Sequence, residues 1–533
     1  MPTVNPAVPA PRSDVPVTIV GGGPVGVVAA LLLIRSGVDA IVVERYSSML
    51  AAPKAHLISP RSLEILTGAG VPLERLEELA PARDGNTKAW YVNSLAGRAF
   101  GWRPYEPGAE RGQFAERVNI AQPILEKALR EHLEAIAPGT LRTGHRWISS
   151  LTDGDGVLSE IDGPDGSYQL RSAYLIAADG AGSGIRESLG IRMQGPPPPD
   201  ARATIHFEAD LRDVVAGRQG MLYFVGNEST EGTLLAYDPA STWAYLCAPL
   251  NPETAEQDAV EIIRAAIGAD RPFRIKGISS WTVAAEVAER YADRRTFLVG
   301  DAAHRFPPTG GLGLNTGLGD ADNLAWKLSA VLRGGAAPAL LDTYDSERRP
   351  VGEQNRDQSL ANLVDLMRVY PTMIGYDEHR DDELLQQTID RQLAAVNTIG
   401  LQLGYRYGGG KEITVLTHEP TAEVGDHVPA VPLAVGGGIR SIIDRTGFSL
   451  LVAPGAGAPW RSALARSPLA PRVVEVELAF EDDTWWNALL GLIGEGAVLV
   501  RPDAHILGRY ASPRESSEVI AAITGLLQTE SVH

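Results

Sequence analysis

The sequence predicts an α/β protein of several domains, in which a β-rich segment interrupts one parallel α/β unit and a second α/β unit follows. Three observations support this prediction. Residues 15–44 have the pattern of a strand, a glycine turn, a helix and a second strand. Apolar strands of the same kind return at 173–178 and 296–300, on either side of aromatic, strand-like segments within 201–289. After residue 412 the chain alternates again between strand and helix patterns.

The first predicted elements lie in an uncharged apolar run, Val15–Ile34. A run of this length is about what a membrane-spanning helix needs. However, Gly21-Gly22-Gly23-Pro24 would break such a helix near its centre, because glycine and proline both disfavour helix interiors. We therefore interpret the run as a buried strand, a tight turn and a helix that ends at Arg35. This interpretation predicts no membrane segment.

The glycines of this turn fit a dinucleotide-binding fingerprint. Gly21, Gly23 and Gly26 match G-x-G-x-x-G, and Glu44 ends the next predicted strand. The first glycine permits the tight turn, the second lets the backbone approach a pyrophosphate, and the third lets helix and strand pack closely. The amides at the helix N-terminus face the phosphates, and Glu44 can accept hydrogen bonds from ribose hydroxyls. An acid at this position favours FAD or NAD over a 2′-phosphorylated NADP.

Two later strands deliver an aspartate at their carboxyl ends, where ligands bind in open α/β sheets. The first is Leu175–Gly180, which ends in Asp179, and the second is Phe297–Asp301. Glycines after Asp301 allow backbone amides to approach a planar ligand, and the helix that follows points its N-terminus at that ligand. The alternative for each aspartate taken alone is a capped turn.

Turns and composition shifts predict the domain boundaries. A proline run at 196–199 separates the first α/β unit from the β-rich segment, and Gly408-Gly409-Gly410 precedes the last unit. The predicted segments are a disordered N-terminus at 1–14, a nucleotide-binding domain at 15–195 and 290–405, a β-rich inserted domain at 196–289 with a contribution from 85–118, and an α/β domain at 412–533.

Composition narrows the partners. The chain has 48 Lys and Arg against 66 Asp and Glu, a formal net charge of −18, which argues against nucleic acid and anionic membranes. Its one cysteine, Cys247, excludes an internal disulfide, a CxxC redox pair and a cysteine-rich zinc site. We predict a cytoplasmic protein with no metal site, and we expect Cys247 to be a buried apolar residue.

Together, the three motifs resemble the signature of class A FAD-dependent aromatic hydroxylases. The third motif reads GDAAHRFPPTGGLGLNTGLGDADNLAWKL from Gly300 onward. The resemblance is greatest to the phenol hydroxylases and to the aromatic-polyketide hydroxylases of secondary metabolism. It implies a Rossmann-like FAD-binding domain, an inserted β-sheet substrate domain and a C-terminal thioredoxin-like domain without redox cysteines. The motifs cover about 15–405, whereas the tail matches by length, element order and the absence of CxxC.

The resemblance also implies the residues that contact FAD. Gly21, Gly23 and Gly26 would hold the pyrophosphate, Glu44 the adenosine ribose and Asp301 the ribitol chain. Pro308 would lie against the flavin near the place where oxygen reacts. The amides of Leu314 and Asn315 would face the pyrimidine edge of the isoalloxazine, where negative charge develops on reduction. The further implied contacts come from Arg45, Arg117, Gln122, Asp179 with Arg186, and Gly313, of which Asp179 and Arg186 are linked to nicotinamide binding as well.

The implied reaction uses NAD(P)H and O₂ to hydroxylate a phenolic or polyketide aromatic ring through a flavin C4a-hydroperoxide. The cofactor supplies this chemistry, while the protein excludes water and holds the ring close. A hydrogen-bonding partner that favours the phenolate would speed the reaction. The sequence leaves open whether NADH or NADPH is used, which ring position reacts and whether the chain forms a homo-oligomer.

The substrate is expected between the flavin and the β-rich domain, whose aromatic and histidine side chains are candidates: His206, Tyr223, Trp243, Tyr245 and Trp281. Of these, Tyr223 and Trp281 are preferred, together with Pro308. No residue is identified as a catalytic acid or base, and His304 is predicted to be structural. Lys54 stands where many relatives carry arginine, so a flavin-related role of this position is in doubt.

Three other functions compete with this hypothesis. A halogenase or oxidase on the same fold is disfavoured because Trp281-Thr282-Val283-Ala284 lacks the Trp-x-Trp-x-Ile-Pro pattern of halogenases. A simple NAD-dependent dehydrogenase leaves the third motif unexplained. A catalytically silent nucleotide-binding interaction protein would not need to keep all three motifs.

Overall fold

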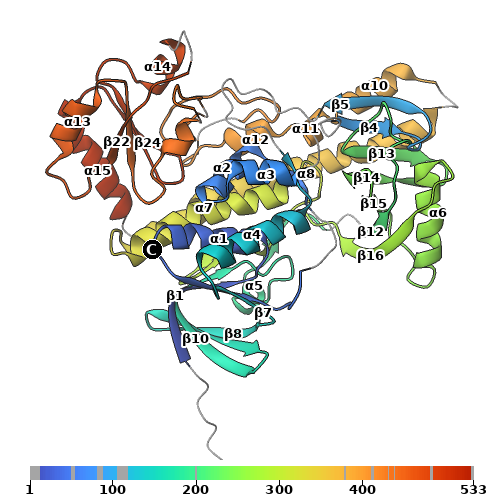
Figure 1. Ribbon diagram of the computed structural model, residues 1–533, viewed down its shortest axis with the longest axis horizontal. Helices are drawn as coiled ribbons and strands as arrows, with labels where there is room; N and C mark the ends of the chain where they lie inside the picture. The colour runs from blue at the N-terminus through green and yellow to red at the C-terminus, as the bar shows by residue number, and fades with distance from the viewer. Residues whose placement is uncertain are drawn as a thin grey trace, which may run out of the picture.

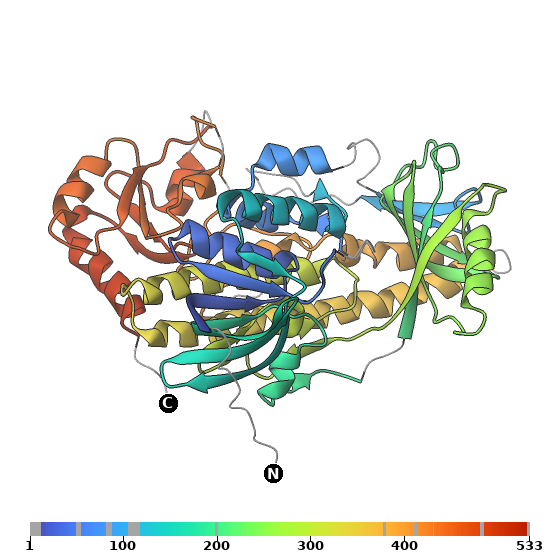
Figure 2. The same cartoon turned by 60° about the horizontal axis from the view of Figure 1, so that its bottom comes forward.

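The computed structural model describes residues 12–49, 55–80, 88–104, 118–197, 201–376, 380–409, 413–429, 431–436, 438–479 and 484–529. A central α/β unit lies between a seven-stranded sheet on one side and a C-terminal α/β unit on the other (Figures 1 and 2). Among the described residues, none of the helices has both the length and the hydropathy that crossing a bilayer requires.

The central sheet is built around five neighbouring parallel strands, in the order β19-β10-β1-β2-β7. Because the strands are parallel, their carboxyl ends share one edge of the sheet. A short antiparallel strand flanks β19, and an antiparallel meander joins β10. The bounds are β1 (Arg12–Val20), β2 (Ala40–Glu44), β7 (Leu141–Thr143), β8 (Arg146–Asp153), β9 (Gly156–Gly163), β10 (Gly166–Ala177), β18 (Ala292–Asp293) and β19 (Thr296–Leu298).

Helix α1 (Pro24–Arg35) explains the uncharged run. Residues Val27–Leu33 are all buried in the main core, where the helix packs against α4 and α7. A helix that is apolar all round belongs in a protein interior. The helices and small strands around it are α2 (Pro60–Gly68), α3 (Leu73–Leu79), α4 (Gln122–Ile136), α5 (Gly184–Ser188), α7 (Leu312–Leu332), β3 (Leu57–Ile58) paired with β6 (Val118–Asn119), and the sheet of β11 (Met193–Gln194), β17 (Glu286–Ala288) and β20 (His304–Arg305).

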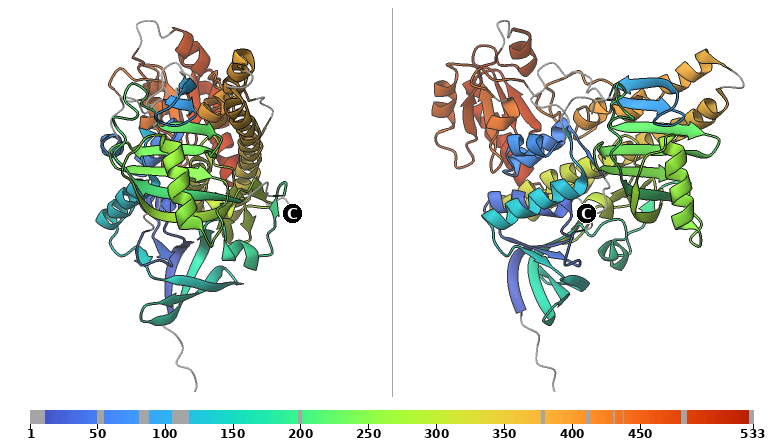
Figure 3. Two further views of the ribbon diagram at one scale, coloured as in Figure 1. Left: turned by 90° about the vertical axis from the view of Figure 1, so that its right-hand side faces the viewer. Right: turned by 45° about the vertical axis from the view of Figure 1, so that its right-hand side comes forward.

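The seven-stranded sheet has the order β16-β12-β15-β14-β13-β4-β5. Strands β4 and β5 come from the segment predicted to contribute to this unit, and β4 pairs in parallel with β13. Helix α6 lies on one face, and the long helix α8 runs along the other (Figure 3). The bounds are β4 (Lys88–Val92), β5 (Ala99–Pro104), β12 (Ala201–Glu208), β13 (Leu222–Asn227), β14 (Thr230–Asp238), β15 (Thr242–Cys247), β16 (Arg274–Thr282), α6 (Ala255–Ile267), α8 (Thr343–Ile374), α10 (Asp382–Asp390), α11 (Leu393–Val396) and α12 (Ile399–Leu403).

The C-terminal unit contains a four-stranded sheet in the order β22-β21-β23-β24. Strands β21 and β22 are parallel and joined through α13, whereas β23 and β24 form an antiparallel hairpin followed by α15. This order is compatible with the thioredoxin-like prediction, which stays a prediction. The bounds are β21 (Ser449–Val452), β22 (Arg472–Glu475), β23 (Ala497–Val500), β24 (Ile506–Tyr510), α13 (Gly457–Leu464), α14 (Thr484–Leu490) and α15 (Ser516–Leu527).

Two observed elements differ from the expectations. Strand β1 begins at Arg12, which pairs with Gln169, so the last residues of the predicted disordered N-terminus are part of the sheet. The rest of that N-terminus lies outside the described residues. Strand β14 was not predicted, because its sequence TEGTLLAYD opens with a polar, glycine-containing stretch and lacks a clean alternation.

Candidate active site

The turn after β1 has the three-glycine geometry that the fingerprint requires. Gly21 has φ +113°, and a Cβ placed on it would lie 2.1 Å from the Ala178 carbonyl oxygen. A Cβ on Gly26 would lie 2.0 Å from the Gly21 carbonyl oxygen. By contrast, a Cβ on Gly23 would meet nothing within 4 Å. The outer glycines are therefore required by packing, while the middle one leaves the backbone open to an approaching phosphate.

Glu44 lies at the carboxyl end of β2 and is only 8% exposed. Its Oε2 accepts a hydrogen bond from the Gly22 amide (2.8 Å), and its Oε1 accepts one from the Tyr46 amide (2.9 Å). The carboxylate thus fixes the glycine turn and keeps further acceptor capacity on both oxygens. Arg130 of α4 supports the same turn, since its Nε and NH2 donate to the Gly22 carbonyl at 3.1 and 2.7 Å.

Arg130 was missed by the sequence analysis. Its only local signal is Glu126 four residues earlier, with which it forms an ion pair of 2.7 Å. That spacing is typical of any helix surface and says nothing about a distant glycine turn.

Two other predicted contacts on this side have their own intramolecular partners. Arg45 is exposed, and its guanidinium lies 4.8 Å from the centroid of the Tyr46 ring. Gln122, at the first turn of α4, accepts a hydrogen bond from the Ala55 amide through Oε1 (3.2 Å). Gln122 therefore anchors the segment that leads into β3. The predicted contact Arg117 and the unusual Lys54 lie outside the described residues.

The middle motif forms a capped turn. Asp179 accepts hydrogen bonds from the Ser183 hydroxyl (2.6 Å) and the Ile185 amide (3.3 Å). Burial raises the pKa of the Asp179 carboxyl in spite of these bonds. Arg186 is buried, and its NH1 donates to the carbonyls of Ala181 and Ala302, each at 3.3 Å. Arg186 thus ties the turn after β10 to the turn after β19.

Asp301 lies at the carboxyl end of β19, in the short helix Gly300–Ala302, and its side chain is exposed. Gly300 has φ +60°, and helix α7 passes so close that a Cβ on Gly317 would lie 2.9 Å from the Gly300 Cα. The strands β19, β10 and β1 are neighbours, so Asp301, Asp179 and Gly21 follow adjacent strands at one edge of the sheet.

A buried charged cluster holds this edge against α7 and α8. His304 is fully buried, and its Nε2 lies 2.9 Å from Asp320 Oδ2. The other carboxylate oxygen of Asp320 accepts from Arg348 Nε (2.9 Å). Burial raises the pKa of Asp320, but Arg348 and His304 outweigh burial, so the net pKa is lowered. His304 thus has the packing of a structural residue.

The N-terminus of α7 is the fourth feature at this edge of the sheet, after the turns that follow β1, β10 and β19. Gly310 and Gly311 both have positive φ, and the helix begins at Leu312. The amides of Leu312, Gly313 and Leu314 lie in the first turn, where no intrahelical carbonyl can accept from them. A Cβ on Gly313 would meet nothing within 4 Å. Pro308, just before this turn, is exposed.

Asn315 contributes through its side chain. Its Oδ1 accepts from the Ser59 amide (3.0 Å) and the Ser62 hydroxyl (2.6 Å). Its Nδ2 donates to the carbonyls of Leu57 (3.0 Å) and Gly311 (2.6 Å). The backbone amide of Asn315 is the first one placed to donate within the helix. The predicted amide donors therefore reduce to Leu314 and its neighbour Gly313.

The register of the seven-stranded sheet decides which aromatic side chains face the central unit. Tyr223, Trp243 and Tyr245 all belong to the core under α6, on the far face. The Tyr223 hydroxyl donates to the Arg218 carbonyl (2.9 Å). This placement makes Tyr223 a core residue and speaks against its preference as a substrate contact. The sequence could not reveal this placement, because the alternation of side chains along a strand defines two faces but does not show which of them α6 covers.

His206 and Trp281 lie on the opposite face. His206 pairs with Ala244, and Ala244 belongs to the core under α8. His206 is buried, its Nδ1 has no partner in the described part of the chain, and burial lowers the pKa of its imidazole. Trp281 is half-buried, and its Nε1 donates to the Thr204 hydroxyl (2.9 Å).

A histidine and a tyrosine that the sequence analysis did not select lie near this face. His56 meets Tyr237 edge-on, with ring centroids 5.7 Å apart, and the neighbouring Leu57 joins the core under α8. Burial lowers the pKa of His56 to about 4, although its Nδ1 contacts Asn119 Oδ1 at 2.9 Å. The contact between His56 and Tyr237 joins the residue before β3 to β14, and no local pattern can reveal it because the two segments are far apart in sequence.

A cavity lies away from the carboxyl edge of the central sheet. This cavity of about 340 Å³ lies at the junction of α1, α2 and α7 with the C-terminal unit, and its lining includes Glu64, Asp322, Arg440 and Arg445.

Among the described residues, no group of three or more His, Cys, Asp or Glu side chains is arranged to hold a metal ion. Burial raises the pKa of the Cys247 thiol to about 11.

The residues at the sheet edge fit FAD. Gly23 and Gly313 leave open space beside backbone amides, while the carboxylates of Glu44 and Asp301 follow β2 and β19. Amides suit a pyrophosphate and a flavin edge, and carboxylates suit ribose or ribitol hydroxyls.

Comparisons with known proteins agree with this geometry. Residues 14–359 match a family model described as an FAD binding domain. The chain is 34% identical to 4-methyl-5-nitrocatechol 5-monooxygenase of a Burkholderia species, over 97% of this chain and 98% of the relative. It is 32% identical to tetracenomycin B2 monooxygenase-dioxygenase of Streptomyces olivaceus, over 96% and 97% of the two chains. The solved structure of the flavin-dependent monooxygenase PieE in complex with FAD and substrate is similar, with a TM-score of 0.87, 32% identity and coverage of 98% of this chain and 100% of that chain. The chain therefore belongs to this family of FAD-dependent aromatic monooxygenases.

Proposed function

We propose that this chain is an NAD(P)H- and O₂-dependent hydroxylase of a phenolic or polyketide aromatic ring. The observation that carries the proposal is the convergence of four features on one sheet edge. These are the glycine turn after β1, the turns after β10 and β19, and the N-terminus of α7. When FAD is bound there, it supplies the oxygen-transfer chemistry through its reduced form and a C4a-hydroperoxide.

The chain's own contribution begins with binding. The open backbone at Gly23 would receive the pyrophosphate, and Glu44 would accept from the adenosine ribose while it holds the turn. Asp301 would accept from the ribitol hydroxyls, because its side chain is exposed at the end of β19. The amides of Gly313 and Leu314, together with the α7 dipole, would stabilise negative charge at the flavin's pyrimidine edge.

The substrate would lie against the α8 face of the seven-stranded sheet, at the end near β3. His206, Trp281 and the His56–Tyr237 pair are the polar and aromatic groups placed on this side. Because burial lowers the pKa of His206, its imidazole is neutral at pH 7 and can accept the proton of a phenol. We therefore assign His206 the role of holding the substrate hydroxyl. As the hydroxyl proton moves toward the imidazole during the reaction, the ring oxygen would gain negative charge and the ring would become more nucleophilic.

The purified protein tests this function directly. We expect flavin absorption near 450 nm, roughly, loss of that absorption when NADH or NADPH is added without oxygen, and oxygen consumption with a phenolic compound. A panel from single-ring phenols to multi-ring polyketides would assign the substrate class. Protein that cannot be reconstituted with FAD, or flavin that no nicotinamide reduces with any panel member present, would refute the proposal.

A further inference from the structure

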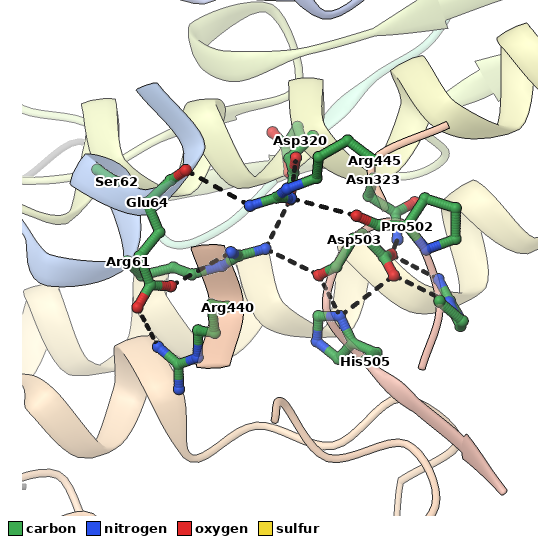
Figure 4. Close-up of polar contacts among 12 residues, drawn as sticks. Arg61, Ser62, Glu64, Asp320, Asn323, Arg440, Arg445, Pro502, Asp503 and His505 are labelled. Carbon is green, nitrogen blue, oxygen red and sulfur yellow. Dashed lines mark hydrogen bonds and ion pairs between the residues drawn. The ribbon is translucent and has the colours of Figure 1, made fainter. Parts of the chain in front are cut away.

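Helix α2 is buried between the central unit and the C-terminal unit. All residues from Pro60 to Leu66 are buried, although three of them are polar or charged. The helix packs against α7 on one side and against the segment Ile439–Ile442 on the other. Figure 4 shows the charged side chains that meet there. A short helix with buried charges depends on its partners for both position and stability.

One side of α2 holds the first turn of α7. Ser59, the N-cap of α2, donates its amide to Asn315 Oδ1, and Ser62 donates its hydroxyl to the same oxygen. Asn315 returns a hydrogen bond to the Leu57 carbonyl, just before α2. The start of α2 and the start of α7 are therefore joined through one carboxamide. A displacement of α2 would change the position of the amides at Gly313 and Leu314.

The other side of α2 holds the C-terminal unit. Glu64 forms a buried ion pair with Arg440, and the Glu64 carbonyl accepts from Arg445 NH2 (3.4 Å). Arg61 donates through NH2 to the backbone carbonyl of Asp503 at 3.0 Å. Arg440, Arg445 and Asp503 all belong to the C-terminal unit. Its contact with α2 is thus made mainly by charged and hydrogen-bonding groups.

Asp322 of α7 binds both α2 and the C-terminal unit. It accepts from Arg61 NH2 at 2.6 Å and from Arg445 NH1 at 3.1 Å. It lies 10 residues beyond Leu312, which corresponds to about 15 Å along the helix. The contacts of α2 and the C-terminal unit therefore hold α7 through Asn315 at its start and through Asp322 further along.

Each buried carboxylate of this network has an arginine partner in the C-terminal unit. The central unit supplies two buried carboxylates, Glu64 and Asp322, but only one arginine, Arg61. The C-terminal unit supplies the other two cations, Arg440 and Arg445. Removing one partner of a buried ion pair leaves an uncompensated charge in a poorly solvated place. Loss of either arginine should therefore displace α2.

We propose that the C-terminal unit is a positioning element for the flavin, in which Arg440 and Arg445 fix α2 and, through Asn315, the first turn of α7. This inference rests on the proposed location of the flavin at that turn. It gives the C-terminal unit a role that uses neither cysteine chemistry nor contact with the reacting atoms. Arg440, Arg445 and Glu64 are positioning residues in this scheme.

The test uses the full-length protein with three variants, Arg440→Gln, Glu64→Gln and the double variant. Arg440→Gln leaves Glu64 with its longer ion pair to Arg61 (3.5 Å) and without its C-terminal partner, so we expect FAD affinity to fall by about 2- to 30-fold. We also expect the flavin midpoint potential to become more negative, because the displaced amides stabilise the reduced, anionic flavin less well. The double variant carries no unpaired charge and should recover part of both losses.

Matched controls separate positioning from stability. Arg461→Gln breaks the exposed 3.0 Å pair with Glu475 in the same unit, and it should change neither FAD affinity nor the potential. If Arg440→Gln does not fold, Arg445→Gln replaces it, since that side chain is 18% exposed and its loss is milder. A folded variant with lowered Tm but wild-type FAD affinity and potential would overturn the inference.

A last variant distinguishes this inference from the flavin location on which it rests. Asn315→Ala removes the carboxamide itself and should shift both FAD affinity and potential. If Asn315→Ala shifts them while the arginine variants do not, only the role of the C-terminal unit is refuted. If Asn315→Ala shifts neither, the flavin is not at this turn, and the inference fails with that location.

Discussion

Close contacts with neighbouring backbone atoms require glycine at Gly21 and Gly26, whereas the exposed side chain of Asp301 has no such constraint. An added Cβ on either glycine would lie within about 2 Å of a carbonyl oxygen. The exposed side chain of Asp301 takes part in none of the hydrogen bonds among the described residues. At this site, some residues are therefore required by the fold, and others are available to bind a ligand.

Asp301→Ala should lower FAD content without lowering the free energy of unfolding of the apoprotein. The carboxylate has no hydrogen-bond partner within the described part of the chain, and surface substitutions of this kind are usually within about 0.5 kcal/mol of neutral. FAD occupancy after purification and urea unfolding of the apoprotein are the two measurements. Asp270→Ala, at an exposed loop position outside the site, is the control. Full FAD occupancy in Asp301→Ala would contradict the assigned role.

Sequence patterns predicted those site residues whose roles depend on their neighbours along the chain. The glycine turn and its acid at Glu44 form a contiguous motif, so both their presence and their geometry could be predicted. Arg130 and Ser62 could not, because each acts on a backbone or side chain that is remote in sequence. Asn315 was predicted for its amide, whereas its carboxamide has the more extensive contacts.

At the scale of elements, the seven-stranded sheet shows what alternation does and does not predict. Strand-like segments were predicted within 201–289, and β12, β13, β14, β15 and β16 all lie in that range. The face of each residue was not predicted, because α6 and α8 both offer apolar surfaces, and only tertiary packing assigns them. The junction of helix α2 with the C-terminal unit was likewise not predicted, because its partners are remote in sequence.

The two faces of this sheet predict opposite results for two conservative variants. Tyr223→Phe removes a hydrogen bond in the α6 core and should cost about 0.5–1.5 kcal/mol of unfolding free energy with no change in kcat/KM. His206→Leu should slow hydroxylation of a phenol by about 100-fold or more, since it removes the proposed proton acceptor. Urea unfolding measures the stability of the two variants, and product formation measures their activity. Loss of activity in Tyr223→Phe, with His206→Leu unaffected, would reverse the assignment of the faces.

At the scale of the whole molecule, buried neutral histidines couple stability to pH. Burial lowers the pKa of His56 to about 4 and also lowers the pKa of His427 and His505 below the usual range. In the unfolded chain these groups titrate near pH 6.5, roughly, so the unfolded state binds more protons in acid. Each such histidine therefore favours unfolding as the pH falls below that value.

The free energy of unfolding should consequently fall between pH 6.5 and pH 4.5. The slope is up to about 1.4 kcal/mol per pH unit for each histidine that stays neutral in the folded state. Urea unfolding at several pH values in excess FAD measures the slope, and His56→Phe should reduce it. A flat profile across this range would show that these imidazoles become protonated without unfolding.

The parallel pairing of β4 with β13 has a consequence for synthesis. Lys88–Val92 leaves the ribosome long before Leu222–Asn227, yet the two strands are direct neighbours in the finished sheet. Until the later segment is translated, β4 and β5 form at most an isolated hairpin, which is only marginally stable in water. The nascent chain therefore carries an unpaired strand edge while about 130 further residues are added, from Val92 to Leu222, and such an edge can associate with other chains.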